Sequence, residues 1–190
     1  MAATSLTELM CAMGVAASCA AVALPGAAAA LDDLRLAGAT RYLSTGLNQA
    51  RLRAVSRSVA VAVEVVRDAR GYAISTYEDG NRNGVLAVDI RDGVDRRVSG
   101  PERLPDLFTG IDFGADPDIP GADGSVAPGN DPVRLGASNR VTFTPLGTAT
   151  PGSLYVRGRR GGQRVVRIYG ETGRTRILQF QARGRTWTPL

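Results

Sequence analysis

The sequence predicts an α+β protein in which one long N-terminal helix packs on an antiparallel β-sheet domain. Three observations lead to this prediction. The chain has no charged residue from Leu9 to Leu31, and apolar residues then recur at helical spacing to about Arg57. Beyond that point, short segments rich in β-branched residues alternate with glycine-containing turns, which is typical of β-hairpins.

The uncharged run is long enough to cross a membrane. A helix from Leu9 to Leu31 spans roughly 35 Å at 1.5 Å per residue, against a hydrocarbon core of about 30 Å. Glu8 stands at the entry of this run, and a carboxylate there is costly unless it is paired, which marks it as a functional candidate. Pro25 is expected to kink the helix rather than end it. Residues 4–30 are therefore predicted to be a membrane anchor.

From Leu31 to about Arg57 the helix is predicted to be amphipathic and to pack on the domain, with most of its arginines outside the apolar face. The predicted apolar face consists of Leu31, Leu34, Tyr42, Leu43, Leu47, Ala50, Ala54 and Val55.

The remaining chain, within a predicted domain of residues 31–190, alternates strands and turns. A Gly/Pro/Asp-rich stretch at residues 114–133 is predicted to be a long loop, and a loop of that length is either functional or mobile. Strands are predicted at residues 59–67, 72–78, 85–90, 107–113, 140–144, 153–157, 164–169 and 174–180.

The composition argues against catalysis and against a bound cofactor. The chain has neither histidine nor lysine, which removes the commonest general base and the Schiff-base nucleophile. Cys11 and Cys19 would stand about 12 Å apart on one helix, too far for a disulfide. We therefore expect a protein that is not an enzyme.

One short segment matches half of a calcium-binding loop. Asp79, Asn81 and Asn83 are spaced as the first ligands of an EF-hand loop, but the twelfth position is Ile90 rather than glutamate. Asn and Gly also tolerate positive φ, so a tight turn accounts for the same residues. We expect the turn, with calcium as the alternative.

The basic character of the chain lies in its last third. Residues 134–190 hold 11 arginines and a single acidic residue, Glu171. Arginines interleaved with aromatic residues can follow a phosphate backbone and stack on bases. A solvated basic surface, or one facing acidic partner subunits or anionic headgroups, is the alternative. The candidate DNA-binding residues are Arg159, Arg160, Arg164, Arg174 and Arg176.

The N-terminal stretch Ala3-Thr4-Ser5-Leu6-Thr7-Glu8 resembles the class III signal of type IV pilins and pseudopilins. If Thr4 is the first mature residue, Glu8 is the fifth and Pro25 the twenty-second, as that signal requires. The resemblance implies a leader of residues 1–3, cleavage between Ala3 and Thr4 by a prepilin peptidase, and methylation of the new amino terminus. An uncleaved anchor, or a secretory signal cut near residues 27–29 to release an exported β-rich protein, remains open.

The C-terminal half resembles the GspH/FimT group of minor pseudopilins through Val141-Thr142-Phe143-Thr144-Pro145-Leu146-Gly147, residues 164–169 and Gly173-Arg174-Thr175-Arg176. The resemblance implies a pilin-like subunit of a type II secretion pseudopilus or type IV pilus. Such a subunit has one span in the bacterial inner membrane and its domain in the periplasm, and it meets other pseudopilins through its helix. Glu8 would then pair with a neighbour's amino terminus. Some FimT-like members bind DNA in natural transformation through a Gly-Arg-x-Arg segment, which makes a DNA-binding minor pilin the alternative.

Overall fold

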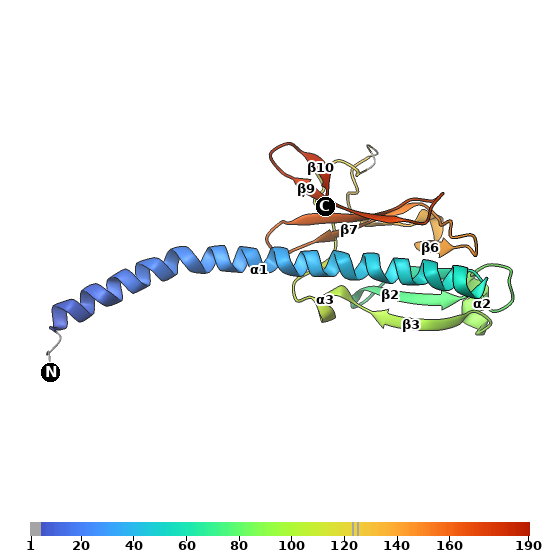
Figure 1. The fold of residues 1–190 in the computed structure, drawn as a ribbon, viewed down its shortest axis with the longest axis horizontal. Coiled ribbons are helices and arrows are strands. Elements are labelled where there is room, and N and C mark those ends of the chain that lie inside the picture. Colours follow the sequence, from blue (N-terminus) through green and yellow to red (C-terminus); the bar gives the residue numbers. More distant parts are fainter. Residues whose placement is uncertain (1–4, 123, 125) are drawn as a thin grey trace.

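The computed structural model describes residues 5–122, 124 and 126–190. One long helix extends from a domain of two β-sheets and continues along it (Figure 1). In chain order the elements are α1 (Leu6–Arg57), β1 (Val61–Asp68), β2 (Gly71–Glu78), α2 (Ala87–Asp92), β3 (Arg96–Glu102), α3 (Leu104–Leu107), β4 (Asp112–Phe113), β5 (Val133–Arg134), the short 3-10 helix η1 (Gly136–Ser138), β6 (Arg140–Phe143), β7 (Gly152–Arg157), β8 (Gln163–Ile168), β9 (Thr175–Gln181) and β10 (Thr186–Pro189).

The strands form two antiparallel sheets that both contact α1. The first sheet has the order β3-β2-β1-β6, and the second has the order β10-β9-β8-β7-β4 with β5 also paired to β7. In Figure 1, α1 passes between β2 and β3 on one side and β7 and β9 on the other. This arrangement confirms the predicted helix packed on an antiparallel domain.

Helix α1 has an exposed half and a packed half. The packed half buries a stripe spaced by three or four residues, as one face of a helix requires. Leu31, Leu34, Tyr42 and Val55 were predicted on this face but are exposed, because the true stripe is rotated around the helix from them. The buried stripe consists of Asp32, Leu36, Ala39, Thr40, Leu43, Leu47, Ala50 and Ala54.

Helix α1 is capped at both ends and contains a proline. Ser5 is the N-cap, and its backbone N–H and the Glu8 carboxylate complete a capping box. Ser58, with φ of 53°, ends the helix in the left-handed conformation. Between them the helix continues through Pro25 and curves in its N-terminal half (Figure 1), so the proline does not end it, as predicted.

The main core lies between α1 and the two sheets, and a smaller cluster lies on the outer face of the second sheet. There Tyr155, Val165 and Leu178 pack with the partly buried Trp187. The Trp187 indole N–H donates to the Pro120 carbonyl at 2.8 Å. The predicted long loop thus covers this face, and its described residues form no helix or strand from Gly114 to Pro132.

Two strand predictions were wrong, and three strands, β3, β5 and β10, were not predicted. Residues 85–90 mostly belong to α2, which lies outside both sheets, and the N–H of its N-cap residue Leu86 donates to Asp95. Residues 107–113 contain only the two-residue β4. The polar strand β3 was missed, although it forms the edge of the first sheet, where arginine and proline are tolerated.

Candidate functional site

Of the N-terminal candidates, Glu8 lies in the first turn of α1. Ala3 and Thr4, the predicted cleavage site, lie outside the described residues. Glu8 is exposed, and its Oε2 accepts the Ser5 backbone N–H at 3.0 Å. The carboxylate therefore lies at the positive end of the helix dipole.

The N-terminal half of α1 leaves its apolar side chains uncovered. Among the described residues, α1 is the one helix long and apolar enough to cross a membrane. An uncovered apolar surface of this length needs an apolar environment, either a bilayer or neighbouring helices. Its large exposed side chains are Leu6, Leu9, Met10, Met13, Val15 and Leu24.

The five candidate arginines do not form one surface. Arg164 is buried in β8, and its Nη2 pairs with Asp33 of α1 at 2.8 Å. It therefore joins the helix to the sheet instead of facing a nucleic acid, which corrects the prediction for this residue. Arg174 and Arg176 are exposed at the start of β9, two residues apart and so on the same side of the strand.

Arg159 and Arg160 lie at the opposite end of β8 from Arg174. They occupy the turn between β7 and β8, whereas Arg174 lies in the turn between β8 and β9. The six residues of β8 separate the two groups by roughly 20 Å. The predicted patch thus consists of two separate basic surfaces.

The glycine of the Gly-Arg-x-Arg segment has a packing role. Gly173 has φ of 60°, and a Cβ there would approach the Gly147 carbonyl oxygen to 2.3 Å. Arg51 of α1 donates from Nε to that same oxygen at 3.0 Å. Both glycines of the family-like segments therefore meet at one point against α1, a contact that sequence reasoning did not foresee.

The calcium candidates form a turn. Asp79 is buried, and its carboxylate accepts the backbone N–H groups of Arg82 at 2.7 Å and Gly84 at 2.8 Å. The Asn83 side-chain amide donates to Asp89 at 2.9 Å. These hydrogen bonds use Asp79 to fold the loop onto itself, as the turn prediction requires.

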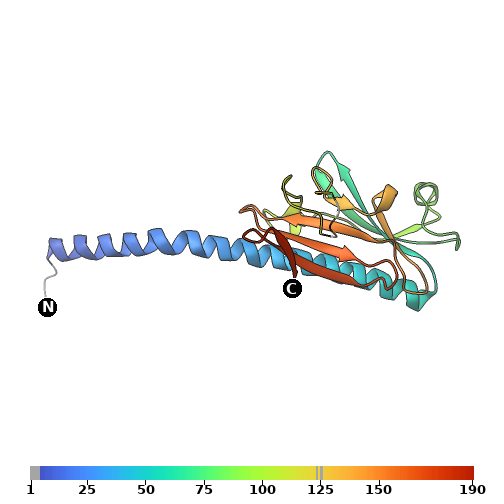
Figure 2. The ribbon, with the colours of Figure 1, turned by 90° about the horizontal axis from the view of Figure 1, so that it is seen from above.

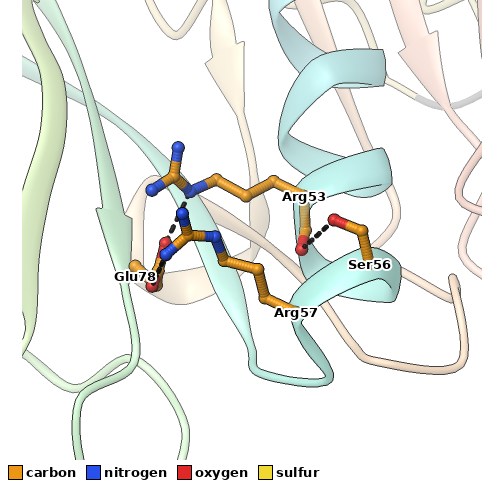
Figure 3. Close-up of polar contacts among 4 residues, drawn as sticks. All are labelled: Arg53, Ser56, Arg57 and Glu78. Atoms are coloured by element: carbon orange, nitrogen blue, oxygen red, sulfur yellow. Dashed lines mark hydrogen bonds and ion pairs between the residues drawn. The ribbon is translucent and has the colours of Figure 1, made fainter.

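A pair of arginines on the last turns of α1 clamps the first sheet (Figure 3). Glu78 at the end of β2 accepts from Arg53 Nε at 2.5 Å and from Arg57 Nη1 at 3.3 Å. Burial raises the pKa of Glu78, but the hydrogen bond and charge of Arg53, with the charge of Arg57, outweigh it. The pKa of Glu78 therefore lies below its ordinary value.

A partly open cleft of about 350 Å³ lies between α1 and β1–β3. Leu43, Leu47 and Val63 are among its apolar lining residues, and Tyr42 lies at its polar side with a hydrogen bond to Glu102. Burial, this hydrogen bond and the charge of Glu102 raise the pKa of Tyr42 to about 12. The phenol therefore stays protonated at neutral pH and keeps donating to the carboxylate.

Comparison with known protein families gives a match over most of the chain. The family model described as type II transport protein GspH matches residues 39–173. The match runs from the packed half of α1 to the β8–β9 turn and stops one residue before Arg174. No curated protein and no solved structure matches the chain.

Proposed function

Since the chain belongs to the GspH family of type II transport proteins, we propose that α1 anchors it in the bacterial inner membrane and joins it to other pseudopilins. At family level the protein is a minor pseudopilin of type II secretion, a structural subunit and not an enzyme. In this proposal residues 4–30 span the membrane and residues 31–190 form the periplasmic domain.

The uncovered apolar half of α1 is the observation that supports the proposal. The packed half is covered by both sheets, whereas the side chains of Leu6, Leu9 and Met13 are more than half exposed. The apolar side chains of α1 thus fall into two groups: the domain buries those of the packed half, and only lipid or other helices can bury those of the exposed half.

Processing would place a second charge beside Glu8. Cleavage between Ala3 and Thr4 by a prepilin peptidase, with methylation of the new amine, leaves that amine one residue before Ser5. In hydrocarbon an unpaired carboxylate is costly, so Glu8 is stabilised if it meets the amine of a neighbouring subunit. An ion pair between Glu8 of one subunit and the amine of the next would fix the axial offset between their two α1 helices.

The test compares Glu8→Ala with wild type in cells that express other pseudopilins and the peptidase. The variant is expected to remain in the membrane but to be recovered roughly tenfold less with its partners, the effect of losing a contact worth about 1–2 kcal/mol. Recovery is measured by affinity purification after crosslinking, and membrane retention is measured by alkaline carbonate extraction.

Glu171→Ala is the matched control, since Glu171 is an exposed carboxylate on the domain. Normal recovery of Glu8→Ala would refute the pairing. The N-terminal residue of the recovered protein tests processing in the same preparation: we expect Thr4 only when the peptidase is present. A start near Ala30 without the peptidase would instead identify an ordinary signal peptide.

DNA binding is the second candidate function, and the exposure of Arg174 and Arg176 favours it. Arg176 also lines a groove of about 600 Å³ between α1 and β9, together with Arg41. Arg174→Ala/Arg176→Ala is expected to weaken duplex binding roughly tenfold or more in a mobility-shift assay at low salt. The control Arg91→Ala/Arg97→Ala removes two exposed arginines elsewhere. Absence of binding by the wild-type chain at low salt would remove this candidate.

A further inference from the structure

Two hairpin turns of the second sheet point toward the apolar half of α1. We call them the proximal tips and define them as residues 158–162, between β7 and β8, and residues 182–185, between β9 and β10. They lie at the same end because β8 and β9 are antiparallel, with Arg164 opposite Gln179. Figures 1 and 2 show both turns, in orange and dark red, at the end of the domain that faces the N-terminal half of α1.

The first proximal tip is held against α1 close to the end of the apolar run. The Arg160 backbone N–H donates to the buried Asp32 carboxylate at 3.1 Å, and its Nη1 reaches the Pro25 carbonyl at 3.4 Å. The stem of Arg159 passes over Gly110, where a Cβ would come within 2.6 Å of its Cδ. Both arginines are exposed, so solvent or a neighbouring surface can reach them at this level.

The charge of the proximal tips is of one sign. They contain Arg159, Arg160, Arg183 and Arg185 and no acidic residue. The nearest acidic side chains on α1 are already engaged, since Asp32 accepts from the tip backbone and Asp33 pairs with Arg164. Two of the tip arginines, Arg160 and Arg185, donate to the backbone carbonyls of Pro25 and Asp118, which carry no charge, so these contacts leave the positive charge of the tips uncompensated.

The position of the tips along α1 matches the surface of a bilayer. About twenty helical residues fill a hydrocarbon core of about 30 Å, so the proposed anchor of residues 4–30 is longer than the core. If the hydrocarbon begins at Leu6, it ends near Pro25, and the last residues of the anchor lie at the headgroups. Arg160 touches α1 at that residue. Arginine forms two-pronged hydrogen bonds with phosphate, and basic residues at this depth are attracted to anionic headgroups.

We infer that the proximal tips bind the phosphate groups of anionic phospholipids in the membrane that α1 spans. The inference rests on the proposed membrane anchor. It adds a second contact between the protein and the membrane, through the domain, and it fixes how the domain stands on the surface. The occupant is lipid and not duplex DNA, because a membrane-embedded α1 places the tips at the headgroups.

The test measures how fast phenylglyoxal modifies individual arginines of the full chain reconstituted into vesicles. One set of vesicles is phosphatidylcholine alone, and the other is phosphatidylcholine mixed with phosphatidylglycerol. Arg159, Arg160 and Arg183 are expected to react roughly fivefold more slowly in the anionic vesicles at low salt. Arg91 and Arg97, far from the tips, serve as internal controls and should react equally in both.

A variant extends the test. Arg159→Gln/Arg160→Gln should return the reaction rate of Arg183 in anionic vesicles toward its rate in phosphatidylcholine. Arg91→Gln/Arg97→Gln should leave it slow. Because all of these side chains are exposed, the substitutions remove charge without opening the core.

Three outcomes would overturn the inference. Equal rates in both vesicle types, with the chain resistant to carbonate extraction, would refute the lipid contact while leaving the anchor intact. Loss of the chain on carbonate extraction from both types would refute the anchor, and with it the proposed function. Protection by added duplex DNA, but not by phosphatidylglycerol, would assign the tips to nucleic acid.

Discussion

At the level of single residues, Gly173 shows how a short motif can be retained for packing. Its positive φ disfavours any side chain, and its contact with the Gly147 carbonyl leaves no room for one. Gly173→Ala is therefore expected to lower the free energy of unfolding by about 2–4 kcal/mol. Urea denaturation of the detergent-solubilised chain, followed by Trp187 fluorescence, measures this loss.

Gly161→Ala separates the two causes. Gly161 also has a positive φ, of 80°, but no atom lies within 4 Å of the position its Cβ would take. This control should lose only about 1 kcal/mol, the cost of the backbone conformation alone. Equal losses for the two variants would show that the close contact with Gly147 contributes nothing.

Glu78 makes part of the stability depend on pH. Its pKa is lowered in the folded protein from an ordinary value of 4.5, so the folded state holds the proton less tightly than the unfolded state. Its contribution is therefore complete above pH 4.5 and is lost as the pH falls through the folded value. Glu78→Gln should cost about 1 kcal/mol or less at pH 7, because the pair is partly exposed.

The difference between Glu78→Gln and wild type should shrink as the pH falls below 4.5, in denaturation experiments repeated across the pH range. Glu171→Gln, an exposed control, should show no such trend. A difference that stays constant from neutral to acid pH would contradict the role assigned to the Arg53 and Arg57 clamp.

Sequence reasoning located the charged residues but not their surroundings. Arg164 looked equivalent to Arg159 and Arg160, yet its partner Asp33 lies 131 positions away in the chain. Only the packing of β8 on α1 brings these two together. The turn at Asp79 was predicted because residues close in the chain form it: the Asp79 carboxylate accepts from backbone N–H groups no further along than Gly84.

At the level of elements, α1 holds the two sheets together through its buried stripe. Leu47 is almost fully buried and belongs to the main core, whereas Leu52, five positions later, is mostly exposed. Leu47→Ala is expected to lower the free energy of unfolding by about 2–5 kcal/mol, the range for a cavity-forming change. Leu52→Ala should change it by less than about 0.5 kcal/mol, as at an ordinary surface site.

The free energies of unfolding of the two variants are measured under identical detergent conditions. Similar losses for both would mean that the buried face of α1 is not the one we describe. A large loss for Leu47→Ala alone would confirm that α1 is part of the core of the domain as well as its extension.

The elements that sequence predicted correctly are those whose pattern is local. The helix follows from apolar spacing, and β1, β2, β6, β7, β8 and β9 follow from β-branched residues between turn residues. Strand β3 escaped prediction because an edge strand buries little and so needs no apolar alternation. Residues 85–90 have strand-like composition, but four of them form the start of α2, and the Asp95 side chain accepts the Leu86 N–H just before it. That contact lies outside any local pattern.

At the level of the whole molecule, the two ends of the domain differ in charge. The proximal tips are basic, whereas the loop from Asp79 to Asp95 at the other end gathers several aspartates. The long apolar first half of α1 could be predicted from composition, because it depends only on an uncharged run in the sequence. The split between the two arginine groups could not, since it depends on the pairing of β8 with β7 and β9.

The continuity of α1 also has a mechanical consequence. The same hydrogen-bonded rod passes from its uncovered half through Pro25 into the core, without a linker that could absorb motion. A torque or an axial pull applied to the first half is therefore delivered to both sheets at once. The domain would turn or advance together with its helix, so a displacement of the first half of α1 is passed on to the domain.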